Sequence, residues 1–254
     1  MADLSPFSLE GRTALVTGAG SGIGQAIALG LARAGAEIFA VGHTSIDDTR
    51  AKFQEMGGRH LAATADLSRE EEIERIVKRA LEAWGKIDIL VNVAGVIRRS
   101  PAEEHPLTDW DAVLNLNLRS VFLLCQHVGH HMLARSYGKI INIASMLTFM
   151  GGYTVVSYAA AKSGIAGLTR TLANEWAGRG INVNAIAPGW IETKMTQAIQ
   201  ENRERYHFIL SRIPAGRWGK PEDLVGAAVF LASSAADYVN GHILVVDGGY
   251  LARG

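Results

Sequence analysis

The sequence has almost no cysteine and no surplus of charge of either sign. Cys125 is the only cysteine among 254 residues, so no disulfide can form within the chain. Because it ends an apolar run that begins at Val121, we expect it to pack in the core rather than to act as a nucleophile. The 25 lysine and arginine residues balance 25 aspartate and glutamate residues. This balance gives no overall attraction to nucleic acid or to an anionic membrane.

Long apolar runs are also absent. No stretch has the apolar length that a membrane-spanning helix needs. Residues 1–12 contain Asp3, Pro6 and Glu10 and lack the apolar block of a secretory signal. We therefore expect a protein of the reducing cytoplasm.

What the sequence does contain is an alternation of short apolar runs with longer helical patterns. Continuous runs such as Ala14-Leu15-Val16 indicate strands buried on both faces, as in a parallel sheet covered by helices. The alternation predicts a doubly wound α/β sheet in a single domain over residues 1–254, with a polar, mobile substrate lobe at about 193–218. The predicted strands are 13–17, 37–41, 60–65, 87–92, 139–144, 181–187 and 243–246, and the predicted helices are 23–34, 46–56, 69–84, 110–134, 158–177 and 221–232.

A glycine-rich segment follows the first predicted strand. Residues 17–24 read Thr-Gly-Ala-Gly-Ser-Gly-Ile-Gly and lead into the first helix. Glycines there let a pyrophosphate approach backbone N–H groups at a helix N-terminus. Although the spacing differs from G-x-G-x-x-G, the position between strand and helix predicts a dinucleotide site.

The end of the second predicted strand bears on the choice of dinucleotide. The sequence there is Gly42-His43-Thr44-Ser45. It has no carboxylate that would repel the 2′-phosphate of NADP. It also has no neighbouring arginine or lysine that would pair with that phosphate and so favour NADP over NAD. Both NAD and NADP therefore remain open.

Tyr158 and Lys162 form the candidate acid–base pair. They are four positions apart in a segment of helical composition, so both side chains lie on one helical face. A nearby ammonium favours the phenolate and would lower the tyrosine pKa from about 10. Such a pair suits proton exchange with an alcohol or a carbonyl near neutral pH.

These motifs occur together with Asn92-Val93-Ala94-Gly95, Asn117, Ser145 and Pro188-Gly189…Thr193. From about Leu9 to the C-terminus the chain resembles the short-chain dehydrogenase/reductase family, although Val93 stands where that family usually has a second asparagine. The resemblance implies a Rossmann-type fold, NAD(P)-linked oxidoreduction and a homodimer or homotetramer.

The resemblance also implies roles for particular residues. Tyr158 would exchange the proton, Ser145 would hydrogen-bond the substrate oxygen, and Asn117 would anchor a water leading protons to solvent. Lys162 would hold the nicotinamide ribose and depress the tyrosine pKa. The implied cofactor-binding residues are Gly18, Ser21, Gly22, Ile23, Gly24, His43, Thr44, Asp66, Leu67, Asn92, Ala94, Gly95, Tyr158, Lys162, Pro188, Gly189, Ile191 and Thr193.

A narrower likeness to the sugar-acid branch of the family rests on residues 97–99, 143–147, 212–219 and 247–253. It implies hydride transfer on a linear sugar acid, with reduction of a keto-deoxy-hexonate as first choice and oxidation of gluconate to 5-ketogluconate as second. Arg98 and Arg99 follow a strand at the sheet edge where ligands bind, so either guanidinium could clamp a carboxylate. The predicted substrate residues are Arg98, Arg99, Ser145, Met146, Tyr158 and Trp190, with Arg205 and His207 as weaker candidates.

Two further possibilities are weighed on the sequence. His127, His130 and His131 suggest a metal site, but no carboxylate or cysteine joins them at a ligand-like spacing, so we expect no metal. A non-catalytic dinucleotide-binding regulator is the alternative of a different class. Such a protein could dispense with Ser145, Tyr158 or Lys162, and all three are present.

Overall fold

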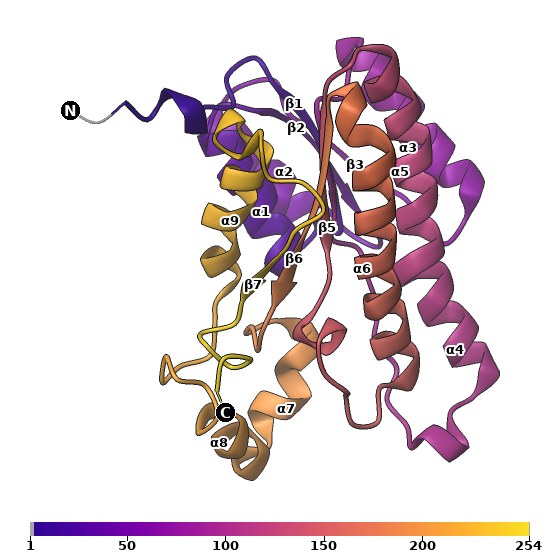
Figure 1. Ribbon diagram of the computed structural model, residues 1–254, viewed down its shortest axis with the longest axis vertical. Helices are drawn as coiled ribbons and strands as arrows, with labels where there is room; N and C mark the ends of the chain where they lie inside the picture. Colours follow the sequence, from indigo (N-terminus) through magenta and orange to yellow (C-terminus); the bar gives the residue numbers. More distant parts are fainter. Residues whose placement is uncertain (1–2, 254) are drawn as a thin grey trace.

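The computed structural model describes residues 3–253, in which one parallel sheet separates two layers of helices (Figure 1). Residues 1, 2 and 254 of the predicted domain lie outside this range. The seven strands have the order β3-β2-β1-β4-β5-β6-β7, which confirms the predicted doubly wound, Rossmann-type sheet. Their bounds are β1 Thr13–Thr17, β2 Glu37–Gly42, β3 Leu61–Thr64, β4 Ile89–Asn92, β5 Gly138–Ile143, β6 Ile181–Pro188 and β7 Ile243–Val246.

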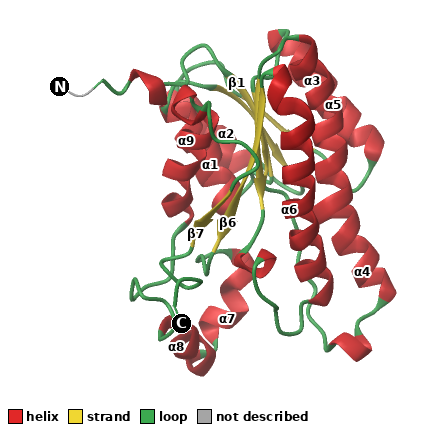
Figure 2. Ribbon diagram, in the orientation of Figure 1, coloured by secondary structure: helices red, strands yellow, loops and turns green. Residues whose placement is uncertain are grey.

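Both faces of the sheet are covered by helices (Figure 2). One face carries α1 (Gly22–Arg33), α2 (Asp47–Met56) and α9 (Val225–Ala232), and the other carries α3 (Glu70–Trp84), α4 (Leu107–Leu114), α5 (Ser120–Ala134) and α6 (Val156–Trp176). Alternate residues of each strand enter opposite cores. Leu15 of β1 packs toward α3, α5 and α6, whereas Ala14 and Val16 pack toward α1 and α9. This double burial explains why the strands read as continuous apolar runs.

The helix predicted at 110–134 is longer and less regular than expected. It begins at Leu107, after Pro106, and a π-helical turn at Asn115–Arg119 joins α4 to α5. The extra residue in a π turn changes which side chains face the sheet, and such turns are frequent at functional sites. Here the turn contains Asn117, which is fully buried.

The segment predicted as a polar substrate lobe contains two short helices, α7 (Gln197–Glu201) and α8 (Arg203–Leu210), for which no helix was predicted. They are held by a small apolar cluster of their own, whose buried members are Met146, Ile199, Ile209, Ile213, Trp218 and Tyr250. Figure 2 shows the arrowheads of β6 and β7 pointing toward α7 and α8, so this lobe lies at the carboxyl edge of the sheet.

The strand order also fixes where a ligand can enter. β1 lies beside both β2 and β4, so the chain connections diverge at this point of the sheet. A crevice opens there beyond the carboxyl ends of the strands, where ligands bind in open α/β sheets. Among residues 3–253, no helix combines the length and the apolar character that crossing a bilayer requires.

Candidate active site

The glycine loop after β1 packs directly on the segment after β4. A Cβ atom on Gly18 would lie 2.7 Å from the Ala94 backbone nitrogen, and one on Gly24 would lie 2.2 Å from the Gly18 carbonyl oxygen. Gly18 has a φ of 66°, in the left-handed region that glycine adopts most easily. Only residues without side chains allow the loop to turn this closely against its neighbours.

The loop also leaves the start of α1 open. Ser21 is the N-cap residue of this 12-residue helix, and its side chain makes no capping hydrogen bond. The first N–H groups of α1 therefore lack a side-chain acceptor, and the positive end of the helix dipole adds to their attraction for an anion. These features fit the pyrophosphate of a dinucleotide.

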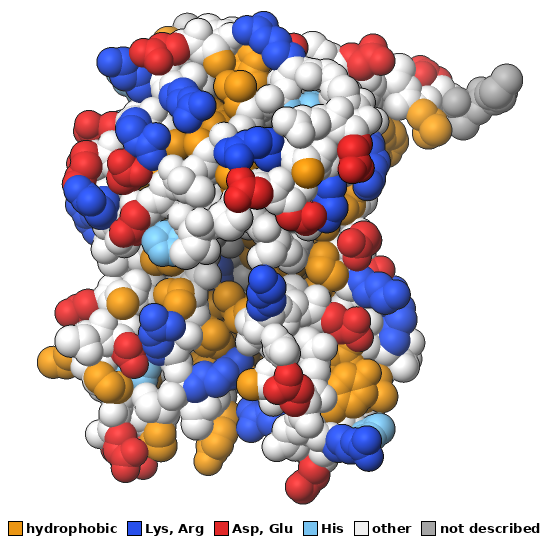
Figure 3. Space-filling view, turned by 180° about the vertical axis from the view of Figure 1, so that it is seen from behind, with side chains coloured by type: hydrophobic (Ala, Val, Ile, Leu, Met, Phe, Trp, Pro, Cys, Tyr) orange, Lys and Arg blue, Asp and Glu red, His pale blue; other side chains and the backbone are white. Residues whose placement is uncertain are grey.

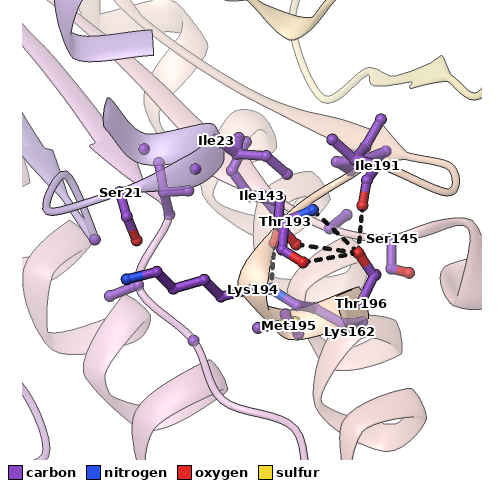
Figure 4. Close-up of a pocket in the computed structure, with 18 of the residues that line it drawn as sticks. Ser21, Ile23, Ile143, Ser145, Lys162, Ile191, Thr193, Lys194, Met195 and Thr196 are labelled. Atoms are coloured by element: carbon purple, nitrogen blue, oxygen red, sulfur yellow. Dashed lines mark hydrogen bonds between the residues drawn. The ribbon is translucent and has the colours of Figure 1, made fainter. Parts of the chain in front are cut away.

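A cavity of about 340 Å³ lies between this loop and the carboxyl ends of β4, β5 and β6 (Figure 4). It brings together most of the predicted cofactor-binding residues. Those that line it are Gly18, Ser21, Gly22, Ile23, Gly24, Ala94, Gly95, Tyr158, Lys162, Pro188, Gly189, Ile191 and Thr193.

Five predicted cofactor-binding residues lie outside this cavity. His43 and Thr44 are exposed after β2, and Asp66 accepts hydrogen bonds from the backbone and side chain of Ser68. Leu67 is buried in the core on the α3 side of the sheet. The Asn92 side chain points into the sheet, where its amide donates to Asn142 Oδ1 at 2.9 Å.

Several residues that line the cavity were missed by sequence reasoning. Ile143 and Ala144 contribute from the end of β5, and Lys194, Met195 and Thr196 follow Thr193. Figure 4 shows the Lys194 side chain extending across the cavity toward Ser21. Its place directly after a predicted cofactor residue, in a cavity suited to phosphates, was the available signal. The Thr196 hydroxyl donates to the Ile191 carbonyl at 2.7 Å and holds this segment against the chain that follows β6.

Three of the four predicted catalytic side chains, those of Ser145, Tyr158 and Lys162, meet at the end of this cavity. Ser145 directly follows Ala144 after β5, and its hydroxyl oxygen accepts a hydrogen bond from the Leu147 N–H at 3.2 Å. Tyr158 and Lys162 lie one turn apart in α6, as predicted. The Lys162 ammonium is buried, donates to the Ile143 carbonyl at 2.6 Å and lies 5.6 Å from the centre of the Tyr158 ring.

The protonation of this group differs from the sequence-based expectation. Burial raises the pKa of Tyr158 to about 12, and the nearby Ser145 side chain and the Arg99 charge offset only part of that rise. Burial lowers the pKa of Lys162 to about 8. The predicted lowering of the tyrosine pKa is therefore wrong for this structure, because loss of water around the phenol outweighs the charges near it.

The Asn117 side chain forms hydrogen bonds with the segment after β4. Its side-chain oxygen accepts from the Val96 N–H at 2.8 Å, and its amide donates to the Val96 carbonyl at 2.8 Å. This pair of hydrogen bonds holds the chain that leaves the cofactor cavity toward Arg98 and Arg99. Asn117 itself lines neither of the cavities described here, and its water-anchoring role remains a prediction.

A second cavity, of about 780 Å³, adjoins the first and shares Ser145, Tyr158, Gly189, Met195 and Thr196 with it. The reactive hydroxyls therefore face both spaces. The predicted substrate residues Arg99, Met146 and Trp190 also line the second cavity. Arg98 does not line it, and instead forms an ion pair with Asp109 at 3.4 Å.

Basic side chains dominate the charge of this second cavity. Arg99, Arg205 and Arg212 line it, and Glu204 is its only acidic residue. Within residues 3–253 none of the three arginines has a carboxylate at ion-pair distance. The face of the molecule seen in Figure 3 is hollowed near its middle, with apolar and basic side chains around the hollow. Such a lining suits an anionic organic molecule.

The histidines of α5 lie in different surroundings from those that the sequence suggested. His127 approaches Glu70 and Glu74 of α3, and the potential ligand atoms of the three lie within 4.8 Å of one another. These carboxylates come from another helix, so spacing along the chain gave no sign of them. Arg119 forms an ion pair with Glu70 at 2.7 Å.

Comparison with known proteins agrees with this geometry. A family model described as enoyl-(acyl carrier protein) reductase matches residues 18–251. The 2-dehydro-3-deoxy-D-gluconate 5-dehydrogenase of Escherichia coli (strain K12) is 53% identical over 98% of this chain and 99% of its own length, and that of Bacillus subtilis (strain 168) is 54% identical over 97% of each. The crystal structure of a gluconate 5-dehydrogenase from Burkholderia cenocepacia J2315, in complex with NADP and tartrate, is 39% identical with a TM-score of 0.94 over 99% of both chains. The chain belongs to the short-chain dehydrogenase/reductase family of NAD(P)-dependent oxidoreductases.

Proposed function

We propose that this protein is a 2-dehydro-3-deoxy-D-gluconate 5-dehydrogenase, also called 2-deoxy-D-gluconate 3-dehydrogenase, which uses NAD or NADP. The observation that carries the proposal is the position of Ser145 and Tyr158 at the junction of two cavities. One cavity has a cradle for a dinucleotide, and the other is lined by arginines without acidic partners. Relatives that are more than half identical over nearly their full length carry this name.

The bound nicotinamide would supply or accept the hydride. In the reducing direction Tyr158 gives its proton to the carbonyl oxygen, and the Ser145 hydroxyl donates a hydrogen bond to that oxygen as its negative charge grows. A pKa of about 12 keeps the phenol protonated at neutral pH, as a proton donor requires. With a pKa of about 8, Lys162 is mainly charged at pH 7, and its ammonium favours the phenolate left behind.

The remaining roles are proposals of the same kind. His43 and Thr44 would contact the adenosine ribose or its 2′-phosphate, Asp66 and Leu67 would border the adenine, and Asn117 would anchor a water that carries protons to solvent. Lys194 would add a positive charge near the pyrophosphate, since its side chain extends toward the glycine loop (Figure 4).

Arg99 is the proposed partner of the substrate carboxylate. It lines the cavity that contains Ser145 and Tyr158, whereas the adjacent Arg98 pairs with Asp109. Met146 and Trp190 would border the carbon chain of the substrate. The second candidate function is oxidation of gluconate at C5, because the Burkholderia relative has this activity in its name and the same cavity would suit either acid. A dehydrogenase acting on another polyol or keto sugar is the broader alternative.

We further propose a cytoplasmic homodimer or homotetramer that binds neither nucleic acid nor membrane. The balanced charge supports the absence of polyanionic partners. Exposed Leu107 and Phe122 on α4 and α5 give a surface suited to contact with a second copy. Light scattering on the purified protein would give the oligomeric state.

The test is a set of NADH and NADPH oxidation assays with keto sugar acids, comparing the wild type with Tyr158→Phe. We expect turnover to fall by roughly 10²- to 10⁴-fold in the variant, because the proton donor is lost. Cofactor affinity should stay within a few-fold, since the aromatic ring remains. Tyr238→Phe is the matched control, because Tyr238 is fully exposed. Near-wild-type turnover of Tyr158→Phe would refute the assignment, and NADPH binding without reduction of any keto sugar acid would favour the non-catalytic regulator.

A further inference from the structure

The lobe at the carboxyl edge of the sheet brings a second guanidinium to the substrate cavity. Arg99 reaches the cavity from the segment after β4, and Arg205 reaches it from α8. The two residues are over 100 positions apart in sequence, so only the fold brings them to one space. Both side chains are partly exposed, and neither has an ion-pair partner in the described part of the chain.

The backbone that carries Arg205 is held firmly in place. The side-chain oxygen of Asn202 accepts from the Arg205 N–H at 3.0 Å and caps the start of α8. Ile209 lies one turn further along the helix on the same face and is buried in the lobe's apolar cluster. Tyr206 stacks on Trp218 with ring centres 5.2 Å apart. These contacts fix the direction in which α8 presents Arg205.

Within the described residues, the charges around Arg99 leave the two guanidinium groups without a neutralising anion. Burial lowers the pKa of Arg99, and the positive charge of Arg205 lowers it further, while Tyr158 opposes the shift. Two like charges therefore lie near each other at this cavity, and among residues 3–253 neither has a carboxylate at ion-pair distance. An anion bound between them would remove that repulsion and accept hydrogen bonds from both guanidinium groups.

Arg212, the third arginine of the cavity, is placed differently. Its guanidinium carbon lies 5.3 Å from the centre of the Tyr250 ring and 5.8 Å from that of Phe208. Contact with two aromatic rings is itself a favourable arrangement for a guanidinium. Among residues 3–253, Arg205 has no comparable partner and is therefore the group available to a ligand.

We propose that Arg205 determines specificity by binding the substrate carboxylate together with Arg99, so that sugar acids are selected over neutral sugars of the same length. This inference rests on the proposed function, because it assigns the second half of that carboxylate site. The two arginines approach the carboxylate from separate elements, one after β4 and one on α8. A neutral substrate would leave the two charges facing each other without compensation.

The kinetic test compares Arg205→Met, Arg205→Lys and the control Arg203→Met. Arg203 lies on the same helix, is exposed and does not line the cavity. Loss of one charge-assisted hydrogen-bonding group should raise KM for the sugar acid about tenfold in Arg205→Met. Because Arg205 is not proposed to contact the reacting oxygen, kcat should stay within about threefold. Arg205→Lys should recover part of the loss, KM for a neutral keto sugar should not rise, and Arg203→Met should behave as the wild type.

A binding measurement separates this inference from the proposed function. Calorimetric titration of the protein–NADP complex with tartrate, a dicarboxylate that serves only as a probe, needs no turnover. We expect about tenfold weaker binding by Arg205→Met than by Arg203→Met. If the wild type reduces no sugar acid but tartrate binding still depends on Arg205, the proposed function fails and the carboxylate site stands. If Arg205→Met retains wild-type KM for the sugar acid and wild-type tartrate affinity, the inference is overturned while the proposed function stands.

Discussion

Arg98 and Arg99 show how much two neighbouring residues can differ once the chain is folded. The sequence alone does not distinguish the two residues, since both follow the same strand and both carry a guanidinium. In the structure Arg98 turns to Asp109 on α4, and Arg99 turns into the cavity that contains Tyr158. The backbone just before the pair is held by hydrogen bonds between Val96 and Asn117, a contact across 21 positions that no local pattern reveals.

We expect Arg99→Ala to raise KM for the sugar acid at least about tenfold, because a charged hydrogen-bonding partner of the carboxylate is lost. Arg98→Ala should change KM by less than about threefold, since it removes only a partly exposed ion pair. Initial-rate kinetics with each variant would check this. Equal effects of the two substitutions would show that the carboxylate is held elsewhere.

The pairing of Tyr158 with Lys162 could be predicted from the sequence, whereas the protonation of the pair could not. Tyr158 and Lys162 are brought together by one turn of helix, a relation that spacing alone determines. The pKa of Tyr158 instead depends on burial by groups from several elements, and burial reverses the predicted direction. Sequence reasoning recognised the pair but could not weigh the loss of water around it.

At the scale of whole elements, the glycine loop after β1 packs closely against the start of α1. Gly24, in the first turn of α1, lies against the Gly18 carbonyl, where an added Cβ atom would be only 2.2 Å away. Because the obstructing atom belongs to the backbone, a side chain cannot be accommodated by a rotamer change. The loop and the helix would have to separate.

Gly24→Ala should therefore weaken NADPH binding at least about tenfold and destabilise the fold by about 1–3 kcal/mol through overpacking. Gly226→Ala is the matched control, because a Cβ atom at this position of α9 meets no atom within 4 Å. There alanine should stabilise the helix by about 0.5–1 kcal/mol. Fluorescence titration with NADPH and thermal unfolding of both variants would measure the two effects. Unchanged NADPH affinity in Gly24→Ala would contradict the close packing of the loop.

The strands and long helices could be predicted because their burial is recorded in continuous apolar runs and helical spacing. The π turn at Asn115–Arg119 and the short helices α7 and α8 could not. A five-residue helix has little intrinsic stability, and the lobe is held by contacts from Met146 and Tyr250, which are distant in the sequence. Part of the second cavity, the proposed substrate site, is therefore built from the least predictable segments.

At the scale of the whole molecule, a buried carboxylate links several segments at the amino edge of the sheet, opposite the two cavities. Asp88 is fully buried just before β4 and forms ion pairs with Lys86 at 2.8 Å and Arg135 at 2.7 Å. Its carboxylate also accepts from the Thr13 N–H at 3.1 Å, at the start of β1. It thus joins β1 and β4 to the chain that follows α5.

This site should control stability in acid. Burial alone would raise the pKa of Asp88, but hydrogen bonds from Lys86, Arg135 and Thr13 outweigh it and hold the pKa below its ordinary value. A carboxylate with a lowered native pKa stabilises the fold fully above its unfolded pKa of about 4, and that contribution is lost as the pH falls through the native value. Stability should therefore decline below about pH 4 through this group.

Asp88→Asn should cost about 2 kcal/mol at pH 7, which is less than a fully buried pair would lose because Lys86 and Arg135 are each one-third exposed. The difference from wild type should shrink as the pH falls through the native pKa of Asp88, because the wild-type carboxyl is then protonated too. Urea unfolding of both proteins across this pH range measures the difference. Asp47→Asn is the control, since it breaks an ion pair of similar length to Arg50 that is largely exposed, and it should change stability little at any pH. A loss in Asp88→Asn that stays constant down to pH 2 would mean that packing, and not the charge of Asp88, joins the two strands.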